Sequence, residues 1–486
     1  MTATTEPTTA TPPRPADGTL RRTGSTVAAL AASELLGKVA TFVMFLLLAR
    51  LLGLAEFGVL SLGFGLGLLL AVLSSSGLDA RLIQLGSAQP DLLDRCYGAL
   101  VGIRAVLSGA ICAVAGPVLL ATMPSADAVT VWLVVLACLV DTFSDASRAC
   151  CGARQEQHRS ALVLVIQRFL TLALVAGSLV LAPRAESAAL AYLAGTVGGA
   201  LAMHLAARRA GVRLRFRGSR PQARLLLQAL PVLGLNAFAS MGLFRIDTAL
   251  VGVMLGTTAV GVYAANYRIF ETVTFVTWTL TRGIVPVVAS RPDDLEHVRR
   301  WAQISMAAML AAYLPYGVLM ALRGDDIVTA LLGAEYADPG LLVALALAPA
   351  LFGIGHQCAS LLLALRPDPV VLVASVLALV VNIGLNLVLI PWCGLLGAAV
   401  ATTVSFAAQA VVLLVVVHRR IGPVVAPRHL LGLGAGCAAA AAWCAALPPL
   451  LPAVLAAGAA YVVATTVVTL AADPRLVGQA QRLRRH

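Results

Sequence analysis

The feature that most constrains this chain is a series of apolar runs about 20 residues long, each able to cross a bilayer as a helix. Of the 486 residues, 59% are hydrophobic and only 12% are charged, so a water-soluble fold would lack polar residues for its surface. The chain is therefore predicted to be an all-α polytopic membrane protein. About fourteen spans are expected, near residues 28–52, 57–80, 96–120, 126–147, 160–182, 186–207, 226–255, 257–282, 300–322, 340–364, 368–390, 393–417, 428–447 and 450–471. The last two are separated only by "LPPLLP", so the number of spans at this end is open.

Arginine is distributed unevenly between the two sides of this arrangement. If the N-terminus is cytoplasmic, the cytoplasmic tails and loops hold 27 arginines and the outer loops hold three, Arg50, Arg184 and Arg323. Cytoplasmic loops of membrane proteins carry such an excess of basic residues. The pattern predicts that both termini are cytoplasmic. It also accounts for most of the formal net charge of +12 without a nucleic-acid partner.

An internal repeat divides the chain into two similar halves. The segment "LLGLAEFGVLS" at 51–61 matches "MLGTTAVGVYA" at 254–264, and both read Leu-Gly-x-x-x-x-Gly-Val. Each segment lies at the hairpin that joins the first two spans of a half. Two six-helix lobes of the same orientation are therefore expected, as in several transporter folds. The alternative is that hairpins rich in Leu and Gly recur by chance.

The expected domain organisation follows from this repeat. The N-terminal stretch is rich in Thr and Pro with almost no large apolar residues, so it is predicted to be disordered, and it lacks the pattern of a cleaved signal peptide. The expected units are a disordered cytoplasmic tail (1–25), an N-terminal six-helix lobe (26–207), a basic cytoplasmic linker (208–224), a C-terminal six-helix lobe (225–420), two additional transmembrane helices (421–472) and a cytoplasmic tail (473–486).

The cysteines offer no sign of a metal centre. All nine are scattered, mostly inside apolar segments, and they show no metal-binding C-x-x-C spacing. They are interpreted as small buried hydrophobic residues. The sequence also lacks the phosphate-binding loop G-x-x-x-x-G-K-[ST]. Neither a metal nor a cofactor is predicted.

Charged residues inside the predicted spans are the strongest functional signal. A charge near the bilayer centre costs at least about 2.5–3.5 kcal/mol on insertion scales, so it normally faces a partner or a wet cavity. The basic residues within the spans are Lys38, Arg104, Arg168, Arg245 and Arg268, and the acidic residues are Glu34, Asp141, Asp145, Asp247 and Glu271.

Depth places three of the cations near the middle of the bilayer. Arg245 and Arg268 lie ten and eleven residues from the outer ends of adjacent spans, which is about 15 Å. Lys38 is expected close to the same level. Cations at this depth predict an anion-binding chamber. The alternative is that each cation pairs with an acidic residue and only holds neighbouring helices together. Arg104 and Arg168 lie nearer the cytoplasm, where they either snorkel or line the inner mouth.

Helical geometry separates residues that share a face from residues that point apart. Arg245 and Asp247 are about 200° apart around a helix, so they cannot form a local ion pair, and Asp247 is expected to meet a neighbouring helix. Arg268 and Glu271 share a face, and Glu271 is expected to hold Arg268 in an empty site. The candidates for ion coupling or charge pairing are Glu34, Asp141, Asp145 and Glu271.

Two stretches resemble a known transporter family. "ARLLGLAEFGVLSLG" and "IDTALVGVMLGTTAVGVYAANYRIFE" are similar to the polysaccharide or oligosaccharide flippases of the Wzx type, in the superfamily that includes MATE exporters and MurJ-like lipid II flippases. The resemblance implies two lobes around a central cavity. It also implies movement of an undecaprenyl-diphosphate-linked oligosaccharide from the inner to the outer leaflet of the bacterial plasma membrane by alternating access. Fourteen spans rather than twelve favour the MurJ-like arrangement.

The cations inside the spans fit that cargo. Arginine binds phosphate oxygens through two parallel hydrogen bonds, so the diphosphate is expected to bind Arg245, Arg268 and Lys38, with Arg104 and Arg168 as inner-mouth cations. The sugar needs a polar cavity, and the lipid tail stays in the bilayer. The expected partners are the lipid-linked glycan, membrane lipids, glycosyltransferases and a polysaccharide polymerase, and the protein is expected to be a monomer.

Other functions stay open beside this one. A MATE-type drug antiporter would use Glu34 or Asp141 for cation coupling, although acidic residues would then be expected to dominate the cavity. A lipid II flippase is a second alternative. A membrane glycan polymerase or glycosyltransferase would carry a long extracytoplasmic loop or an acidic metal motif, and the sequence shows neither. The sequence therefore favours a transporter over an enzyme.

Overall fold

The computed structural model describes residues 17–366, 368–425, 427–447 and 449–472, and in this part the chain is built from helices. The prediction of an all-α membrane protein is confirmed: thirteen helical stretches among the described residues are long and apolar enough to cross a membrane. The elements are α1 (Asp17–Leu52), α2 (Leu54–Ser75), α3 (Leu78–Ala88), η1 (Pro90–Leu92), α4 (Leu93–Thr122), α5 (Ser125–Ala153), α6 (Gln157–Leu181), α7 (Ala185–Arg209), α8 (Arg220–Leu255), α9 (Thr257–Val273), α10 (Phe275–Ala289), α11 (Leu295–Leu331), η2 (Ala334–Tyr336), α12 (Leu341–Leu345), α13 (Ala348–Leu365), α14 (Pro369–Cys393), α15 (Leu395–Ile421), α16 (Pro427–Ala446) and α17 (Leu450–Ala472).

Each predicted span corresponds to one helix or to two consecutive helices. The thirteenth predicted span is α16, whose apolar stretch Leu430–Ala446 is shorter than the other spans and packs along α17. Three spans are interrupted, between α2 and α3, between α9 and α10, and between α12 and α13. The break between α12 and α13 gives no signal in the sequence because apolar residues continue through it. The break between α2 and α3 falls at the polar stretch Ser74–Gly77, which the prediction of one continuous span passed over.

Two of the interruptions have local causes. Ser76 and Gly77 have left-handed backbones, with φ of +48° and +67°, so the chain turns sharply between α2 and α3. At Thr274 the backbone stays helical, with φ −62° and ψ −15°, and the side chain donates a hydrogen bond to the Glu271 carbonyl oxygen at 2.7 Å. Helix α10 therefore continues the course of α9 after a single tight turn.

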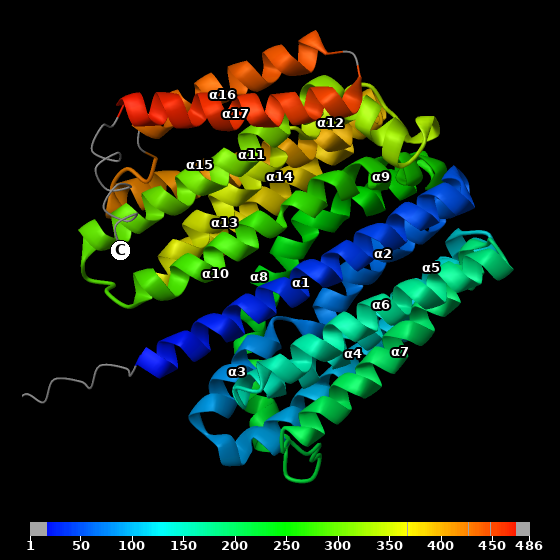
Figure 1. Ribbon diagram of the computed structural model, residues 1–486. Coiled ribbons are helices and arrows are strands. Elements are labelled where there is room, and N and C mark those ends of the chain that lie inside the picture. Colours follow the sequence, from blue (N-terminus) through cyan, green and yellow to red (C-terminus); the bar gives the residue numbers. More distant parts are fainter. Residues whose placement is uncertain (1–16, 367, 426, 448, 473–486) are drawn as a thin grey trace, which may run out of the picture.

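The helices pack as two large groups and a smaller pair (Figure 1). Helices α1 to α7 pack mainly with one another, and helices α8 to α15 form the second group around α14 and α15. The antiparallel helices α16 and α17 lie along α11. Arg323 helps to attach them: it breaks the helical backbone of α11 at φ −134°, and it donates hydrogen bonds to the carbonyl oxygens of Cys444 and Leu447 at 3.2 and 2.8 Å.

The two groups meet where α2 lies along α8 and α9. Gly53 and Gly256 precede α2 and α9 with φ of +77° and +88°, a conformation that favours glycine. Further along, Gly58 and Gly261 let the two helices touch: a Cβ atom at Gly58 would come within 1.9 Å of a backbone oxygen of α9, and one at Gly261 within 2.6 Å of a backbone oxygen of α2. We call this end of the bundle the hairpin end, and the opposite end, which holds residues 210–219, the linker end.

The basic linker packs against the first group at the linker end. Val212 is fully buried, and Asp94 accepts a hydrogen bond from the Arg213 backbone nitrogen at 2.9 Å. Asp94 also pairs with Arg215 at 3.4 Å, and a Cβ atom at Gly98 would lie 1.9 Å from the Arg215 carbonyl oxygen. The linker is therefore held closely against α4 rather than hanging free between the two groups.

Asp247 lies in the interior of the second group. Its side chain is fully buried and accepts hydrogen bonds from the hydroxyl of Tyr263 at 2.5 Å, the hydroxyl of Thr402 at 2.9 Å and the backbone nitrogen of Thr248 at 2.7 Å. As helical geometry predicts, this aspartate meets neighbouring helices instead of pairing with Arg245. Because three donors converge on it, Asp247 joins α8 to α9 and α15.

Replacing Asp247 with alanine should destabilise the protein. Each buried donor left without its acceptor costs about 1–3 kcal/mol, so Asp247→Ala should lower both the melting temperature and the amount of protein in the membrane. Thermal unfolding in detergent, followed by size-exclusion chromatography, measures this. The exposed Asp91→Ala serves as the control and should unfold like the wild type. Equal melting temperatures for both variants would contradict the structural role of Asp247.

Candidate functional site

Two arginines from adjacent helices share one carboxylate. Arg245 on α8 pairs with Glu271 through Nη2 and Oε1, and Arg268 on α9 reaches the other oxygen, Oε2, at 2.7 Å. The side chains of Arg245, Arg268 and Glu271 are 12%, 18% and 15% exposed. We call these three residues the arginine–glutamate cluster. The structure brings together the two arginines that were predicted at one depth, and Glu271 contacts both of them rather than Arg268 alone.

The arginine–glutamate cluster also contacts the first helix group. The guanidinium carbon of Arg268 lies 3.7 Å from the centre of the Phe45 ring on α1 and 6.0 Å from that of Phe64 on α2. A cation over an aromatic face is attracted by the ring. Phe64 packs edge-on against Phe45 and Tyr192, each at 4.9 Å between ring centres. The cluster therefore lies at the boundary between the two groups.

The cluster has unused capacity to bind an anion. Two guanidinium charges oppose one carboxylate, which leaves an excess of positive charge. The buried polar atoms without a hydrogen-bond partner in the described part of the chain include Nε of Arg245 and the hydroxyl of Tyr267, the residue before Arg268. Buried donors without partners are uncommon, and phosphate oxygens are strong acceptors for arginine. The arrangement is suited to a phosphate-like anion.

Lys38 does not join the arginine–glutamate cluster. It is exposed on α1, seven residues before Phe45, which corresponds to about 10 Å along the helix toward the linker end. The structure therefore places Lys38 nearer the linker end than the two arginines, rather than at their level as expected. Helix α1 begins at Asp17, before the apolar stretch from which the depth of Lys38 was predicted. The side chain of Glu34 lies outside the described part of the chain.

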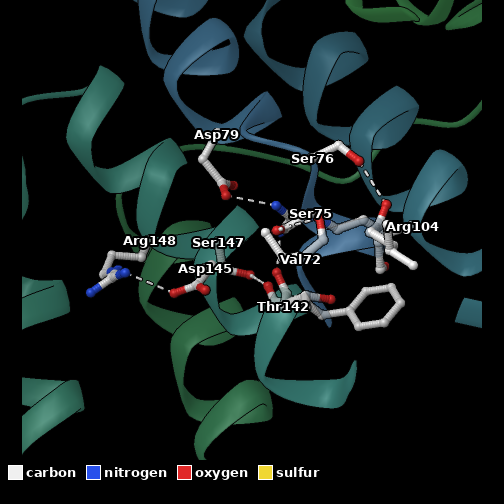
Figure 2. Close-up of polar contacts among 12 residues, drawn as sticks. Val72, Ser75, Ser76, Asp79, Arg104, Thr142, Asp145, Ser147 and Arg148 are labelled. Carbon is white, nitrogen blue, oxygen red and sulfur yellow. Dashed lines mark hydrogen bonds and ion pairs between the residues drawn. The ribbon is translucent and has the colours of Figure 1, made fainter. Parts of the chain in front are cut away.

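A second charged contact lies within the first group. Asp141 on α5 pairs with Arg168 on α6 at 3.4 Å and accepts a hydrogen bond from Gln167 at 3.2 Å. The side chains of Asp141 and Arg168 are about a quarter exposed. Asp145 pairs with Arg148 at 2.8 Å on the exposed side of α5 (Figure 2). The acidic candidates of α5 thus have partners of their own and do not enter the arginine–glutamate cluster.

Arg104 is enclosed by three helices (Figure 2). Its side chain is 0% exposed, pairs with Asp79 of α3 at 2.7 Å, and donates a hydrogen bond to the Thr142 carbonyl oxygen of α5. Arg104 does not snorkel as one of the two expectations had it, because its charge is satisfied inside the bundle. Neither does the side chain line an open mouth in this conformation. Its contacts join α4 to α3 and α5.

The hairpin end is closed by further contacts between the two groups. The Tyr336 hydroxyl donates a hydrogen bond to the Ala49 carbonyl oxygen at 2.7 Å, and the Tyr336 ring packs edge-on against Phe57 at 5.6 Å. Arg50 donates from Nε to the Leu331 carbonyl oxygen at 2.7 Å. The sequence does not single out Tyr336, Phe45 or Tyr267, since isolated aromatic residues in apolar spans give no signal of what they face.

A family model described as "Polysaccharide biosynthesis protein" matches residues 47–339. Two relatives from Haloferax volcanii are similar. The probable low-salt glycan biosynthesis flippase Agl15 is 27% identical over 170 residues, which cover 34% of this chain and 36% of that protein. The probable flippase AglR is 30% identical over 169 residues, which cover 33% of this chain and 35% of that protein. The match spans about a third of the length of each relative.

Solved structures share the fold. The lipid II flippase MurJ, in an inward closed conformation, superposes with a TM-score of 0.75 at 11% identity, over 90% of this chain and 98% of that one. An inward-facing multidrug transporter of the MATE family and MOP superfamily superposes with a TM-score of 0.68 at 13% identity, over 80% and 95%. At these identities the likeness concerns the fold, which is the one the sequence resemblance predicted. Because the family model covers more than half of the chain, this membrane protein belongs to the polysaccharide biosynthesis protein family.

Proposed function

We propose that this protein is a flippase that moves an undecaprenyl-diphosphate-linked oligosaccharide across the bacterial plasma membrane by alternating access, for synthesis of a cell-surface polysaccharide. The observation that carries the proposal is the arginine–glutamate cluster, which concentrates positive charge at the boundary between two helix groups. Its family and the flippases among its relatives support this class of transport.

The cluster has the chemistry to bind the diphosphate and release it again. Without substrate, Glu271 neutralises part of the charge of Arg245 and Arg268, which lowers the cost of keeping them inside the membrane. A diphosphate carries more negative charge than one carboxylate and offers more acceptor oxygens. It would therefore take hydrogen bonds from both guanidinium groups.

The proposed orientation places the hairpin end outside and the linker end in the cytoplasm. The arginines of the linker follow the distribution expected for cytoplasmic segments. Both termini would then be cytoplasmic. The glycosyltransferases that assemble the lipid-linked glycan would act on the cytoplasmic side, and a polysaccharide polymerase would receive it outside. Within this orientation the contacts at the hairpin end close the outer side of the protein.

Replacing either arginine of the cluster should abolish most of the transport. Arg245→Ala and Arg268→Ala each remove hydrogen bonds to a charged group, worth about 1.5–3 kcal/mol, so substrate affinity should fall roughly tenfold to a hundredfold. Arg→Lys should restore only part of it, because an ammonium group lacks the planar fork. Movement of lipid-linked oligosaccharide across proteoliposomes measures the effect.

The matched control for these variants is Arg217→Ala, which removes an exposed arginine of the linker and should transport at the wild-type rate. Protein levels and melting temperatures of all the variants should stay close to the wild type, since Glu271 keeps one arginine partner in each. Wild-type transport by both Arg245→Ala and Arg268→Ala would overturn the proposal.

The orientation can be tested through Cys393, an exposed cysteine at the hairpin end of α14. A membrane-impermeant maleimide should label Cys393 in intact cells, and Cys393→Ser should remove this labelling. In the Cys393→Ser background, Asp325→Cys on α11 should be labelled from outside. Arg291→Cys, in the turn between α10 and α11, should be labelled only after the cells are opened. The reverse pattern would invert the topology. Pro448, a second site predicted outside, lies beyond the described residues.

Closure of the hairpin end should depend on the contact between Gly58 and Gly261. Gly58→Val places a side chain where a Cβ atom alone would meet a backbone oxygen at 1.9 Å, so α2 and α9 must separate. In the Cys393→Ser background, a cysteine at the buried position Ala49 should then become reactive from outside, and transport should fall. Gly109→Val, at a glycine with open space around it, is the control. Protection of position 49 in the Gly58→Val protein would show that this contact does not close the outer side.

A further inference from the structure

Helices α9 and α10 run from the arginine–glutamate cluster toward the linker end. Trp278 on α10 lies seven residues after Glu271. Because Thr274 has helical φ and ψ, α10 continues the course of α9. Trp278 therefore lies about 10 Å further along than the cluster, toward the linker end.

Trp278 presents its indole next to an imidazole. The ring centres of Trp278 and His356, on α13, lie 4.3 Å apart with 60° between the ring planes. Phe352 lies behind them, at 6.2 Å from Trp278 and 5.6 Å from His356, and its own ring packs against Phe244 and Phe406 at 4.8 and 5.6 Å. Although it is held by these contacts, Trp278 remains 39% exposed.

The neighbouring polar groups make this surface both rigid and able to form hydrogen bonds. Thr281, three residues after Trp278, donates a hydrogen bond to Oε1 of the buried Gln357 at 3.1 Å, which ties α10 to α13. Nε2 of Gln357 is a buried donor without a partner among the described residues. Within the described residues, His356 makes no hydrogen bond, and its ring nitrogens are not fully buried. These nitrogens can donate a hydrogen bond to a bound molecule or accept one from it.

We infer that Trp278 and His356 form a saccharide subsite for the sugars next to the diphosphate; this inference rests on the proposed flippase function. The C–H face of a sugar ring packs on an indole, and its hydroxyl groups bond to the imidazole nitrogens, which fits a mostly apolar wall with few polar groups. A glycan is attached directly to the diphosphate. A separation of about 10 Å from the cluster therefore places the subsite within reach of its first sugars.

The subsite also has a physical role in transport. The arginines recognise only the anion, which every diphosphate-linked lipid carries, whereas Trp278 and His356 contact the part that differs between glycans. Because these residues belong to the second helix group, the sugar and the diphosphate would be held by the same group. The glycan would then move as one unit with its anion when the two groups rearrange.

The test compares two ligands of the purified, full-length protein in nanodiscs. One is undecaprenyl diphosphate, and the other is the lipid-linked oligosaccharide that accumulates in cells lacking the protein. Trp278→Ala should weaken binding of the oligosaccharide about tenfold and leave the Kd of undecaprenyl diphosphate unchanged. Trp278→Phe should restore most of the affinity, and His356→Ala should weaken only the oligosaccharide. Trp392→Ala, at an exposed tryptophan at the end of α14, should alter neither Kd.

Two outcomes would overturn the saccharide subsite. One is no effect of Trp278→Ala on the Kd of either ligand, as expected if Trp278 contacts only lipid. The other is an equal loss of affinity for both ligands. Failure of the proposed function has a different signature. In that case Arg245→Ala and Arg268→Ala would leave the Kd of undecaprenyl diphosphate unchanged, whatever Trp278→Ala does.

Discussion

The shared carboxylate of Glu271 determines how two arginines can lie together inside a membrane protein. Each buried guanidinium would carry a large desolvation cost if it were alone, and two side by side would also repel each other. Glu271 offsets part of both effects by offering one oxygen to Arg245 and the other to Arg268. The compensation is incomplete, because one positive charge remains. In the proposed flippase, the diphosphate of the substrate would neutralise that remaining charge, so the contact that stabilises the empty site would also leave it able to bind an anion.

Helix α9 links this site to the closure of the hairpin end. Gly261 and Arg268 are seven residues apart on α9, so one rigid segment carries both the contact with α2 and a member of the cluster. Arg268 in turn lies on the Phe45 ring of the first group. A movement that separates α9 from α2 therefore changes the surroundings of Arg268. In this arrangement an anion bound by Arg268 and the packing of Gly261 act on the same element, which is the physical requirement for coupling binding to a change of shape.

The sequence was sufficient for features that depend on one helix at a time. Apolar length predicted the spans, and the helical repeat predicted that Arg268 and Glu271 share a face while Asp247 points away from Arg245. It was insufficient for contacts between helices, because periodicity does not fix how one helix is rotated against the next. The pairing of Arg245 with Glu271 and the enclosure of Arg104 by Asp79 are of this kind. Lys38 was misplaced because polar residues extend α1 beyond its apolar part.

The predicted internal repeat bears on one contact of the scaffold but not on the site. Gly58 and Gly261 occupy matching positions in the two similar segments, and they meet each other at the hairpin end. The positions 203 residues before Arg245, Arg268 and Glu271 hold Phe42, Gly65 and Leu68. The charges therefore belong to the second half alone, and the first half contributes the aromatic ring of Phe45 to the boundary. Because of this asymmetry, an anion held by the cluster would move with the second group. The cation–π contact between Arg268 and Phe45 joins the two groups, so it would break and re-form when they change their relative position.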